Sequence, residues 1–285
     1  MIEKLNKHSN NKTSQYGEDG IIEYLINTSK SAINKSCFEV GAGDGVTYSN
    51  TFSLWHDKSW QAVLVEANPE RYNPLISNYG AYENVSICTD FLEIRGENSI
   101  DELILSRLPS DLTDVGVMSI DIDSFDYHIF KNIEKINPQI VVIEFNNYIP
   151  PHIDYFDPEG KVFLRCSAKS IERLGKEKGY KMVACTVTNA ILLREDCFDS
   201  ELHPDMPVEY LFDYDGQKEN GSIPFSVVLS QMVTRFPVFT KKPNTAEKIF
   251  YKLRGWLTSL LPRRETFQRP DREVVEQLRK SGLHI

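Results

Sequence analysis

The sequence has little cysteine and no long hydrophobic run, and each shortage excludes a class of protein. Its five cysteines are widely spaced, and no C-x-x-C pair occurs. Zinc modules and disulfide frameworks need paired or closely spaced cysteines, so both are excluded. No apolar run approaches the roughly 18 residues of a membrane-spanning helix. Most of the cysteines lie in apolar runs, and we interpret them as core residues of a protein in a reducing compartment.

The chain also lacks an excess of positive charge. Its 285 residues hold 32 Lys and Arg against 41 Asp and Glu. An acidic chain is poorly suited to the phosphates of a nucleic acid, so we expect no nucleic-acid partner. Residues 1–12 lack the apolar core of a signal peptide, so we expect a cytoplasmic protein. Hydrophobic residues make up 41% of the chain, which is typical of globular proteins.

The charge is unevenly distributed. Residues 241–285 hold eleven Lys and Arg against five Asp and Glu, whereas residues 1–240 hold 21 against 36. The segment 247–264 combines helical apolar spacing with basic residues. We expect this helix to pack on the protein's own surface, or to dock to an anionic membrane or a partner enzyme, which would make the protein membrane-peripheral. The predicted units are a main domain over 1–197, an irregular extension over 198–245 and a basic helical tail over 246–285.

Short apolar runs alternate with helical patterns along the main domain. Five runs rich in Val and Ile end in acids or glycine, which is typical of parallel strands buried on both faces. They lie at 37–40, 61–66, 85–88, 115–122 and 139–145, with helical patterns at 49–55, 69–79, 99–107 and 125–135. Asn98 or Ser99, and Ser124, are expected as helix N-caps.

A helix over 167–178 and two further strand-like runs follow. The runs 180–187 and 190–195 are separated only by Thr188 and Asn189, which predicts an antiparallel hairpin. The sequence therefore predicts an α/β fold with a Rossmann-like seven-stranded sheet. Five strands are parallel, a hairpin closes the sheet, and helices cover both faces. In the all-parallel dinucleotide-binding fold the last strand arrives by another crossover instead.

A glycine loop, Glu39-Val-Gly41-Ala-Gly43-Asp44-Gly45, follows the first predicted strand. Glycines there allow positive φ and a close approach of the backbone to a ligand. A dinucleotide loop needs G-x-G-x-x-G, and this loop is one residue tighter. Carboxylates at Glu39 and Asp44 would repel a pyrophosphate. They would suit a cation such as the sulfonium and ammonium of S-adenosylmethionine.

Two further acids end the second and third predicted strands. Glu66 is placed to accept hydrogen bonds from ribose hydroxyls, a role that NAD sites share. Asp90 is placed to receive an adenine amino group. Alternatively, these acids only end strands and cap helices. Their position beside the glycine loop favours a cofactor site.

Three stretches outside the glycine loop carry a family resemblance. They are Ser14-Gln-Tyr-Gly-Glu-Asp-Gly20, Asp44-Gly-Val-Thr-Tyr-Ser-Asn50-Thr51, and Ser119-Ile-Asp-Ile-Asp123 with Asp126-Tyr127. With the loop, they make the chain resemble the FkbM-like branch of class I S-adenosylmethionine-dependent methyltransferases over roughly residues 13–195. Members act mainly on hydroxyl groups of sugars, polysaccharides and polyketides.

The resemblance implies which residues hold the cofactor. The glycine loop and residues 49–51 would contact its methionine end, and Gln15 and Glu18 would close the pocket. Alternatively, Ser14 is an N-cap with Glu18 and Asp19 in the first helical turn. The residues assigned to the cofactor are Gln15, Glu39, Gly41, Gly43, Asp44, Asn50, Thr51, Glu66 and Asp90.

Acids and amides also follow the fourth and fifth predicted strands. Strand alternation places Asp121 and Asp123 on the same side, and Glu144 and Asn146 end the neighbouring strand. Ligands of open α/β sheets bind beyond the strand carboxyl ends, at the switch point between the first and fourth strands. We therefore expect these four side chains to converge beside the reactive methyl group.

Three interpretations of these residues stay open. In the first, Asp121, Glu144 and Asn146 ligate Mg²⁺, which lowers the pKa of the acceptor hydroxyl. In the second, no metal is bound, and Asp121 or Asp123 is the base while Glu144 and Asn146 bind sugar hydroxyls. In the third, the acids only cap helices and the amides shape turns. His128 is a further candidate base, although a lone histidine there is more often a packing residue.

These observations predict an S-adenosylmethionine-dependent O-methyltransferase. The expected acceptor is a hydroxyl of a sugar or glycan, or of its nucleotide- or lipid-linked precursor; a phosphate-linked group or small natural product is the alternative. Transfer needs alignment and removal of the hydroxyl proton. A non-catalytic methyltransferase-like module and a dinucleotide-dependent enzyme are the other candidates. The residues assigned to catalysis are Asp121, Asp123 and His128, and those assigned to the acceptor are Glu144, Asn146 and Asn189.

Overall fold

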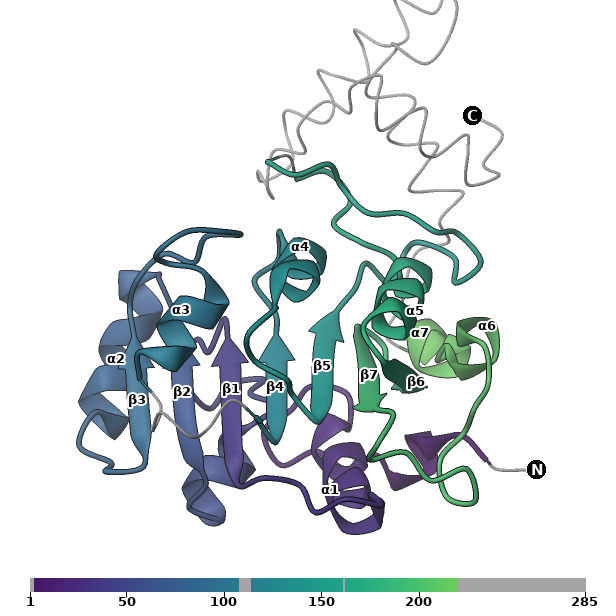
Figure 1. Ribbon diagram of the computed structural model, residues 1–285, viewed down its shortest axis with the longest axis horizontal. Coiled ribbons are helices and arrows are strands. Elements are labelled where there is room, and N and C mark those ends of the chain that lie inside the picture. The colour runs from purple at the N-terminus through teal and green to yellow at the C-terminus, as the bar shows by residue number, and fades with distance from the viewer. Residues whose placement is uncertain (1–2, 108–113, 161, 220–285) are drawn as a thin grey trace, which may run out of the picture.

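The computed structural model describes residues 3–107, 114–160 and 162–219. Its centre is a seven-stranded sheet in the order β3-β2-β1-β4-β5-β7-β6 (Figure 1). Strands β1 to β5 are parallel, and β7 runs antiparallel to both β5 and β6. The predicted Rossmann-like sheet with a closing hairpin is confirmed. The strands are β1 (Ser36–Val40), β2 (Gln61–Val65), β3 (Val85–Cys88), β4 (Val117–Ile120), β5 (Ile140–Glu144), β6 (Tyr180–Cys185) and β7 (Asn189–Arg194).

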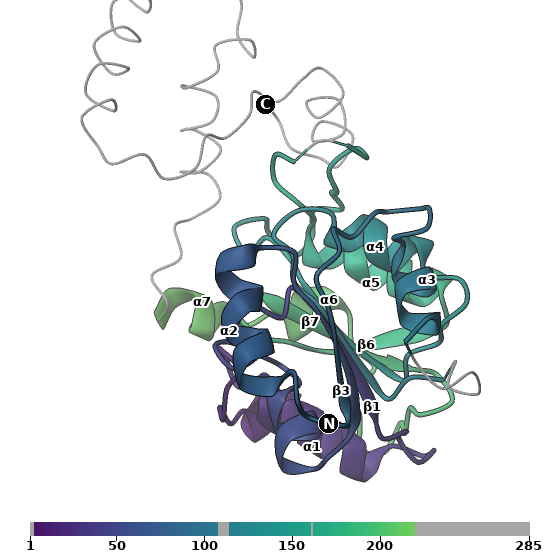
Figure 2. The same ribbon diagram turned by 90° about the vertical axis from the view of Figure 1, so that its left-hand side faces the viewer.

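Helices cover both faces of the sheet, as Figure 2 shows along its edge. This explains why the central strands are apolar at successive positions: every residue of β1 and β4 is buried. One face is packed by η1 (Leu5–His8), α1 (Glu18–Thr28), η2 (Ser53–Asp57) and α2 (Pro69–Tyr79). The other is packed by α3 (Ile100–Leu105), α4 (Asp126–Asn132), α5 (Ala168–Glu177) and α6 (Val208–Leu211). A last short helix, α7 (Tyr214–Glu219), ends the described part of the chain.

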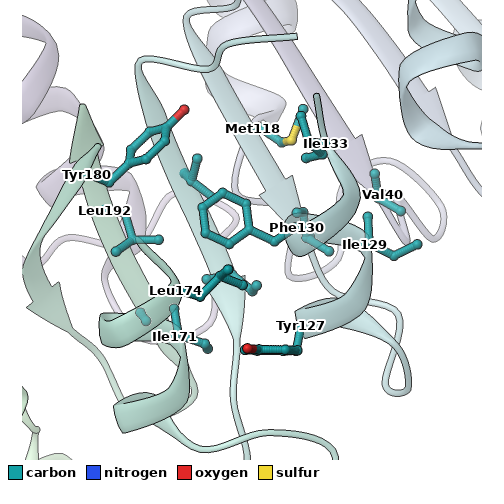
Figure 3. Packing of buried hydrophobic residues seen from close by; sticks show 14 of the residues in the cluster. Val40, Met118, Tyr127, Ile129, Phe130, Ile133, Ile171, Leu174, Tyr180 and Leu192 are labelled. Carbon is teal, nitrogen blue, oxygen red and sulfur yellow. The ribbon is translucent and has the colours of Figure 1, made fainter. Parts of the chain in front are cut away.

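The core beneath α4 holds the loop that follows β4 in place. Phe130 of α4 is fully buried, and its ring meets that of Tyr180 edge-on, with centroids 5.8 Å apart. Leu174 of α5 and Leu192 of β7 belong to the same cluster (Figure 3). Burying a side chain as large as phenylalanine stabilises the fold by about 2–3 kcal/mol. Because α4 is anchored in this way, residues 121–125 leave β4 along a fixed path.

The helix predicted over 49–55 is wrong for most of its length. Only one π-helical turn forms, at Ser53–Asp57. The Ser49 and Thr51 hydroxyls and the Asn50 N–H all donate to the carboxylate of Glu39, at 2.5, 2.8 and 2.7 Å. These residues wrap around a buried acid, so they do not begin a helix.

One of the two predicted helix starts is confirmed and the other differs. Ser99 is the N-cap residue of α3, although its side chain makes no capping hydrogen bond. Helix α4 begins at Asp126, not directly after Ser124. The Asp126 carboxylate accepts the N–H groups of Ile122 and Ser124 at 2.8 and 3.0 Å, so it organises the turn that the serine was expected to cap.

The β6–β7 hairpin forms as predicted, but its turn is shifted by one residue. The Thr186 N–H donates to the Asn189 carbonyl at 2.8 Å, which makes Val187 and Thr188 the central residues. Asn189 therefore belongs to β7, opposite Glu144 at the end of β5.

Other predictions concern the cysteines and the C-terminal segments. All five cysteines are buried free thiols, as predicted for core residues. Residues 198–219 contain α6, whose Val208 and Leu211 are buried, and α7. The predicted helix over 247–264 and the remainder of the tail lie outside the described residues. Within the described residues, no helix is both long and apolar enough to cross a membrane.

Candidate functional site

A cavity of about 560 Å³ opens where β1, β2 and β4 end. Its position follows from the topology, because the chain leaves β1 toward β2 but enters β4 on the opposite side, and the loops separate there. The structure brings together ten of the residues that the sequence assigns to a site. They are Gln15, Glu39, Gly41, Gly43, Asn50, Glu66, Asp90, Asp121, Asp123 and Glu144.

The first N–H groups of the glycine loop are used in hydrogen bonds to other protein groups. The N–H groups of Gly41 and Ala42 donate to the Val65 carbonyl at 2.9 and 3.0 Å, and the Gly43 N–H donates to Glu66 Oε2 at 2.9 Å. Gly41 has φ +84°, and a Cβ added there would lie 1.7 Å from the Asp121 carbonyl oxygen. Gly41 therefore lies directly against the end of β4. Together with its hydrogen bond to Val65 of β2, this contact holds the loop between the two strands that flank β1.

Glu39 forms part of the cavity wall, but its oxygens are engaged. Burial raises its pKa to about 7, and the hydrogen bonds from residues 49–51 oppose that rise. These bonds place Asn50 at the cavity, where its Nδ2 donates to Ser119 Oγ at 3.0 Å. Asn50 Oδ1 is buried and has no hydrogen-bond partner within the described residues. It is thus an unused acceptor beside the cavity.

The ends of β2 and β3 bring two acids and one aromatic ring to the cavity. Glu66 Oε1 accepts the Asn68 N–H at 2.8 Å, and Asp90 pairs with Arg107 at 3.2 Å. Phe91 follows Asp90, lines the cavity and is 74% exposed. Phe91 is a cavity residue that was not predicted, although its place directly after a strand-ending acid was a signal in the sequence. An exposed ring offers a flat face to an aromatic ligand.

The acids beyond β4 and β5 converge as predicted, around an arginine that was not predicted. Ligand oxygens of Asp121, Asp123 and Glu144 lie within 4.8 Å of one another. Arg165 pairs with Asp123 at 2.8 Å and also with Glu144. Burial raises the pKa of Asp121, the charge of Asp123 adds to that rise, and hydrogen bonding with Glu144 opposes it. Burial raises the pKa of Glu144 well above its ordinary value, the charge of Asp121 adds to that rise, and Arg165 opposes it.

Two residues assigned to the cofactor lie outside the cavity wall. Asp44 Oδ1 accepts the N–H groups of Val46 and Thr47 at 2.9 and 2.7 Å, which shapes the loop. Thr51 donates its hydroxyl to Glu39. Both therefore stabilise the loop by hydrogen bonds within the protein and do not line the cavity.

His128 is buried among packing contacts, which is the alternative that the sequence left open beside a role as a base. It is 6% exposed and does not line the cavity. Its Nε2 lies 2.7 Å from the Asp157 carbonyl oxygen, and its ring meets those of Tyr127 and Phe156. A ring engaged in this way is not exposed to an acceptor.

Asn146 and Asn189, assigned to the acceptor, also lie outside the cavity wall. Asn146 donates to the Leu164 carbonyl at 3.0 Å and accepts the Tyr148 N–H at 2.9 Å, so both ends of its amide hold turns. Asn189 donates to Glu18 Oε1 at 2.9 Å. The acids that converge are Asp121, Asp123 and Glu144, of which Asp121 and Glu144 belong to the predicted metal set.

Comparison with known proteins gives likenesses of fold only. No protein-family model matches the sequence, and a search of curated proteins found no match. Among solved structures, a SAM-dependent methyltransferase from Aquifex aeolicus is 14% identical, with a TM-score of 0.37, over 62% of this chain and 88% of that chain.

Two other solved structures are similar at the same level. The CMeT domain of the citrinin polyketide synthase is 10% identical, with a TM-score of 0.40, over 62% of this chain and 51% of that one. The trans-methyltransferase CalH, solved with S-adenosylhomocysteine, is 13% identical, with a TM-score of 0.37, over 62% and 55%. This chain thus spans about half the length of both. At these scores the likenesses carry no argument about its activity.

Proposed function

We propose that the protein is an S-adenosylmethionine-dependent O-methyltransferase. The observation that carries the proposal is the charge of the cavity wall. Six acidic side chains line it against one basic side chain, that of Arg71, and the first three N–H groups of the glycine loop already donate to the Val65 carbonyl and to Glu66. A dinucleotide pyrophosphate would meet these carboxylates, whereas a ligand with sulfonium and ammonium charges is attracted by them. The six are Glu39, Glu66, Asp90, Asp121, Asp123 and Glu144.

The residues present fit this cofactor. A Cβ added to Gly43 would meet nothing within 4 Å, so backbone and open space adjoin there. Gly41, Gly43 and Asn50, with its unused buried acceptor, would hold the methionine end. Glu66 and Asp90 would hold the ribose and the adenine. When bound, the cofactor would supply a methyl group on a positively charged sulfur, which is a good leaving group.

Fold and sequence support the same proposal. The order β3-β2-β1-β4-β5-β7-β6 with an antiparallel β7 is that of the class I methyltransferase fold. The motifs around Ser14–Gly20 and Ser119–Asp123 resemble the FkbM-like branch. We therefore propose a hydroxyl of a sugar or glycan, free or linked to a nucleotide or lipid, as the acceptor.

Asp121 is the best-placed base for the acceptor proton. It lines the cavity at the end of β4, and burial raises its pKa, which makes its carboxylate a stronger base. Glu144 lines the same cavity and Asp123 is exposed at its mouth, so these two are placed to bind acceptor hydroxyls. Alignment of the hydroxyl by several groups is the main contribution that the protein makes to such a transfer.

Isothermal titration with S-adenosylhomocysteine and with NAD⁺ tests the proposal. We expect micromolar binding of S-adenosylhomocysteine and none of NAD⁺, because only the former avoids placing phosphates beside the acids. Absence of S-adenosylhomocysteine binding would overturn the proposal. Binding without methyl transfer to any of a panel of sugars, nucleotide sugars and glycans would indicate a non-catalytic module.

A further inference from the structure

Arg165 places a guanidinium among the three carboxylates of the cluster. It donates to Asp123 Oδ1 at 2.8 Å and to Glu144, and its side chain is 21% exposed. Glu144 is 11% exposed, so that pair is largely shielded from water. A divalent ion bound by these oxygens would have to share this space with a permanent positive charge.

The backbone on both sides of the Arg165–Asp123 pair is held in an unfavourable conformation. Asp123 has φ +58° and Arg165 has φ +63°, in the left-handed region that non-glycine residues rarely adopt. Asp126 fixes the first of them by accepting the Ile122 and Ser124 N–H groups on either side of it. Such conformations persist only where the surrounding structure determines them, and they cluster at functional sites.

The loop that carries Arg165 is closed around a single buried carboxylate. Asp157 accepts the N–H groups of Phe163, Leu164 and Arg165 at 2.6 to 3.1 Å. The Asp157 N–H in turn donates to the Arg165 carbonyl at 2.8 Å, and His128 holds the Asp157 carbonyl. The position of the guanidinium is thus built into the fold and is not that of a freely moving surface side chain.

We propose that Arg165 is the resident cation of the acidic cluster, in the place that a divalent metal would otherwise take, and that it positions Asp123 and Glu144. Its fork-shaped guanidinium matches two carboxylates at once, as a fixed metal ion would, without needing to be loaded. The consequence for catalysis, which rests on the proposed function, is that methyl transfer needs no added divalent metal.

Manganese binding tests the inference without any acceptor. Electron paramagnetic resonance of free Mn²⁺ is measured in titrations of the wild type, Arg165→Met and Arg95→Met. Arg95 is a matched control, because it pairs with Glu159 at 2.7 Å outside the cavity. We expect Arg165→Met to bind Mn²⁺ at least roughly tenfold more tightly than the wild type and Arg95→Met, since its carboxylates lose their cation. Adding Asp123→Asn to Arg165→Met should abolish this tighter binding.

Two outcomes would overturn the inference. One is wild-type Mn²⁺ binding as tight as that of Arg165→Met, and the other is a folded Arg165→Met that gains none. If Arg165→Met does not fold, Arg165→Lys replaces it, and its retained positive charge should keep Mn²⁺ from binding. Saturable Mn²⁺ binding by Arg165→Lys would refute the inference that Arg165 is the resident cation. Saturable binding by the wild type that is lost in Asp123→Asn would refute it as well. Titration of the wild type with S-adenosylhomocysteine reports separately on the proposed function.

Discussion

The two halves of the cavity use the same residue type in opposite ways. In the half formed by β1 and β2, Glu39 and Glu66 accept hydrogen bonds from backbone N–H groups and hydroxyls of neighbouring loops. In the half formed by β4 and β5, Asp121, Asp123 and Glu144 face one another and a single arginine. The first acids hold the loops in place, whereas the second are kept close together against their mutual repulsion.

This difference separates acids that stabilise the fold from acids that are placed for chemistry. A carboxylate that satisfies several backbone donors stabilises the fold, and its loss leaves those donors unpaired. Carboxylates crowded together repel one another and stabilise little, and such clusters are typical of functional sites. Variants in the first half should therefore change stability and cofactor binding together, whereas variants in the second should change chemistry.

The largest expected effect comes from a substitution that strains the backbone of the glycine loop. Gly41→Ala would push a Cβ against the Asp121 carbonyl at positive φ, and we expect it to lower the free energy of unfolding by roughly 3 kcal/mol or more. Urea denaturation measures this. Gly160→Ala is the matched control, because it has φ +80° with open space around it and should cost only about 1 kcal/mol. Equal losses would contradict the close approach.

Removing Glu39, the buried acid that residues 49–51 surround, should have the next largest effect. Glu39→Ala leaves the donors of residues 49–51 unpaired, and we expect a loss of roughly 2–4 kcal/mol in unfolding free energy together with loss of S-adenosylhomocysteine binding. Ser49→Ala removes one donor and should cost about 1 kcal/mol. Normal binding by Glu39→Ala would show that residues 49–51 are not part of the cofactor site.

The pH dependence of stability sharpens the comparison further. Burial raises the pKa of Glu39 from its ordinary 4.5 to about 7, so the folded protein binds a proton there that the unfolded chain has released. The unfolding free energy should therefore fall as pH rises from about 4.5 to about 7, by up to about 1.4 kcal/mol per pH unit for this group.

Glu39→Gln should make that decline shallower by this amount. Burial also raises the pKa of Asp126 to about 7, so a decline of the same sign remains in the variant. Urea denaturation of both proteins between about pH 5 and about pH 8 measures the difference. Identical slopes would mean that Glu39 is ionised in the folded protein throughout this range.

The smallest expected effect concerns Asp90, which lies at the exposed rim of the cavity. Asp90→Asn should weaken S-adenosylhomocysteine binding by about 1 kcal/mol, roughly fivefold in Kd, because one polar contact changes and the side chain is half exposed. Asp154→Asn is the control, since Asp154 is similarly exposed and pairs with Arg173 away from the cavity. An unchanged Kd in Asp90→Asn would place the adenine elsewhere.

Local patterns predicted the sheet and half of the site well. The apolar runs before Gly41 and Glu66 are strands β1 and β2, and the acids that end them reach the cavity. The same reasoning failed at 49–55, where helical spacing competed with a buried carboxylate. At His128 the local pattern left two roles open, and the residue contacts the loop carbonyl of Asp157. In both places a contact from outside the segment decided the outcome.

The order of residues along the chain was enough to establish a doubly covered sheet and which acids end its strands, because burial periodicity is a local property that each strand carries by itself. Which of those acids became loop anchors and which became a charged cluster depended on contacts made at a distance. Arg165 reaches Asp123 across 42 residues, and only a loop closed around Asp157 brings it there. Charges interact through space, so their roles are settled only once the chain has folded.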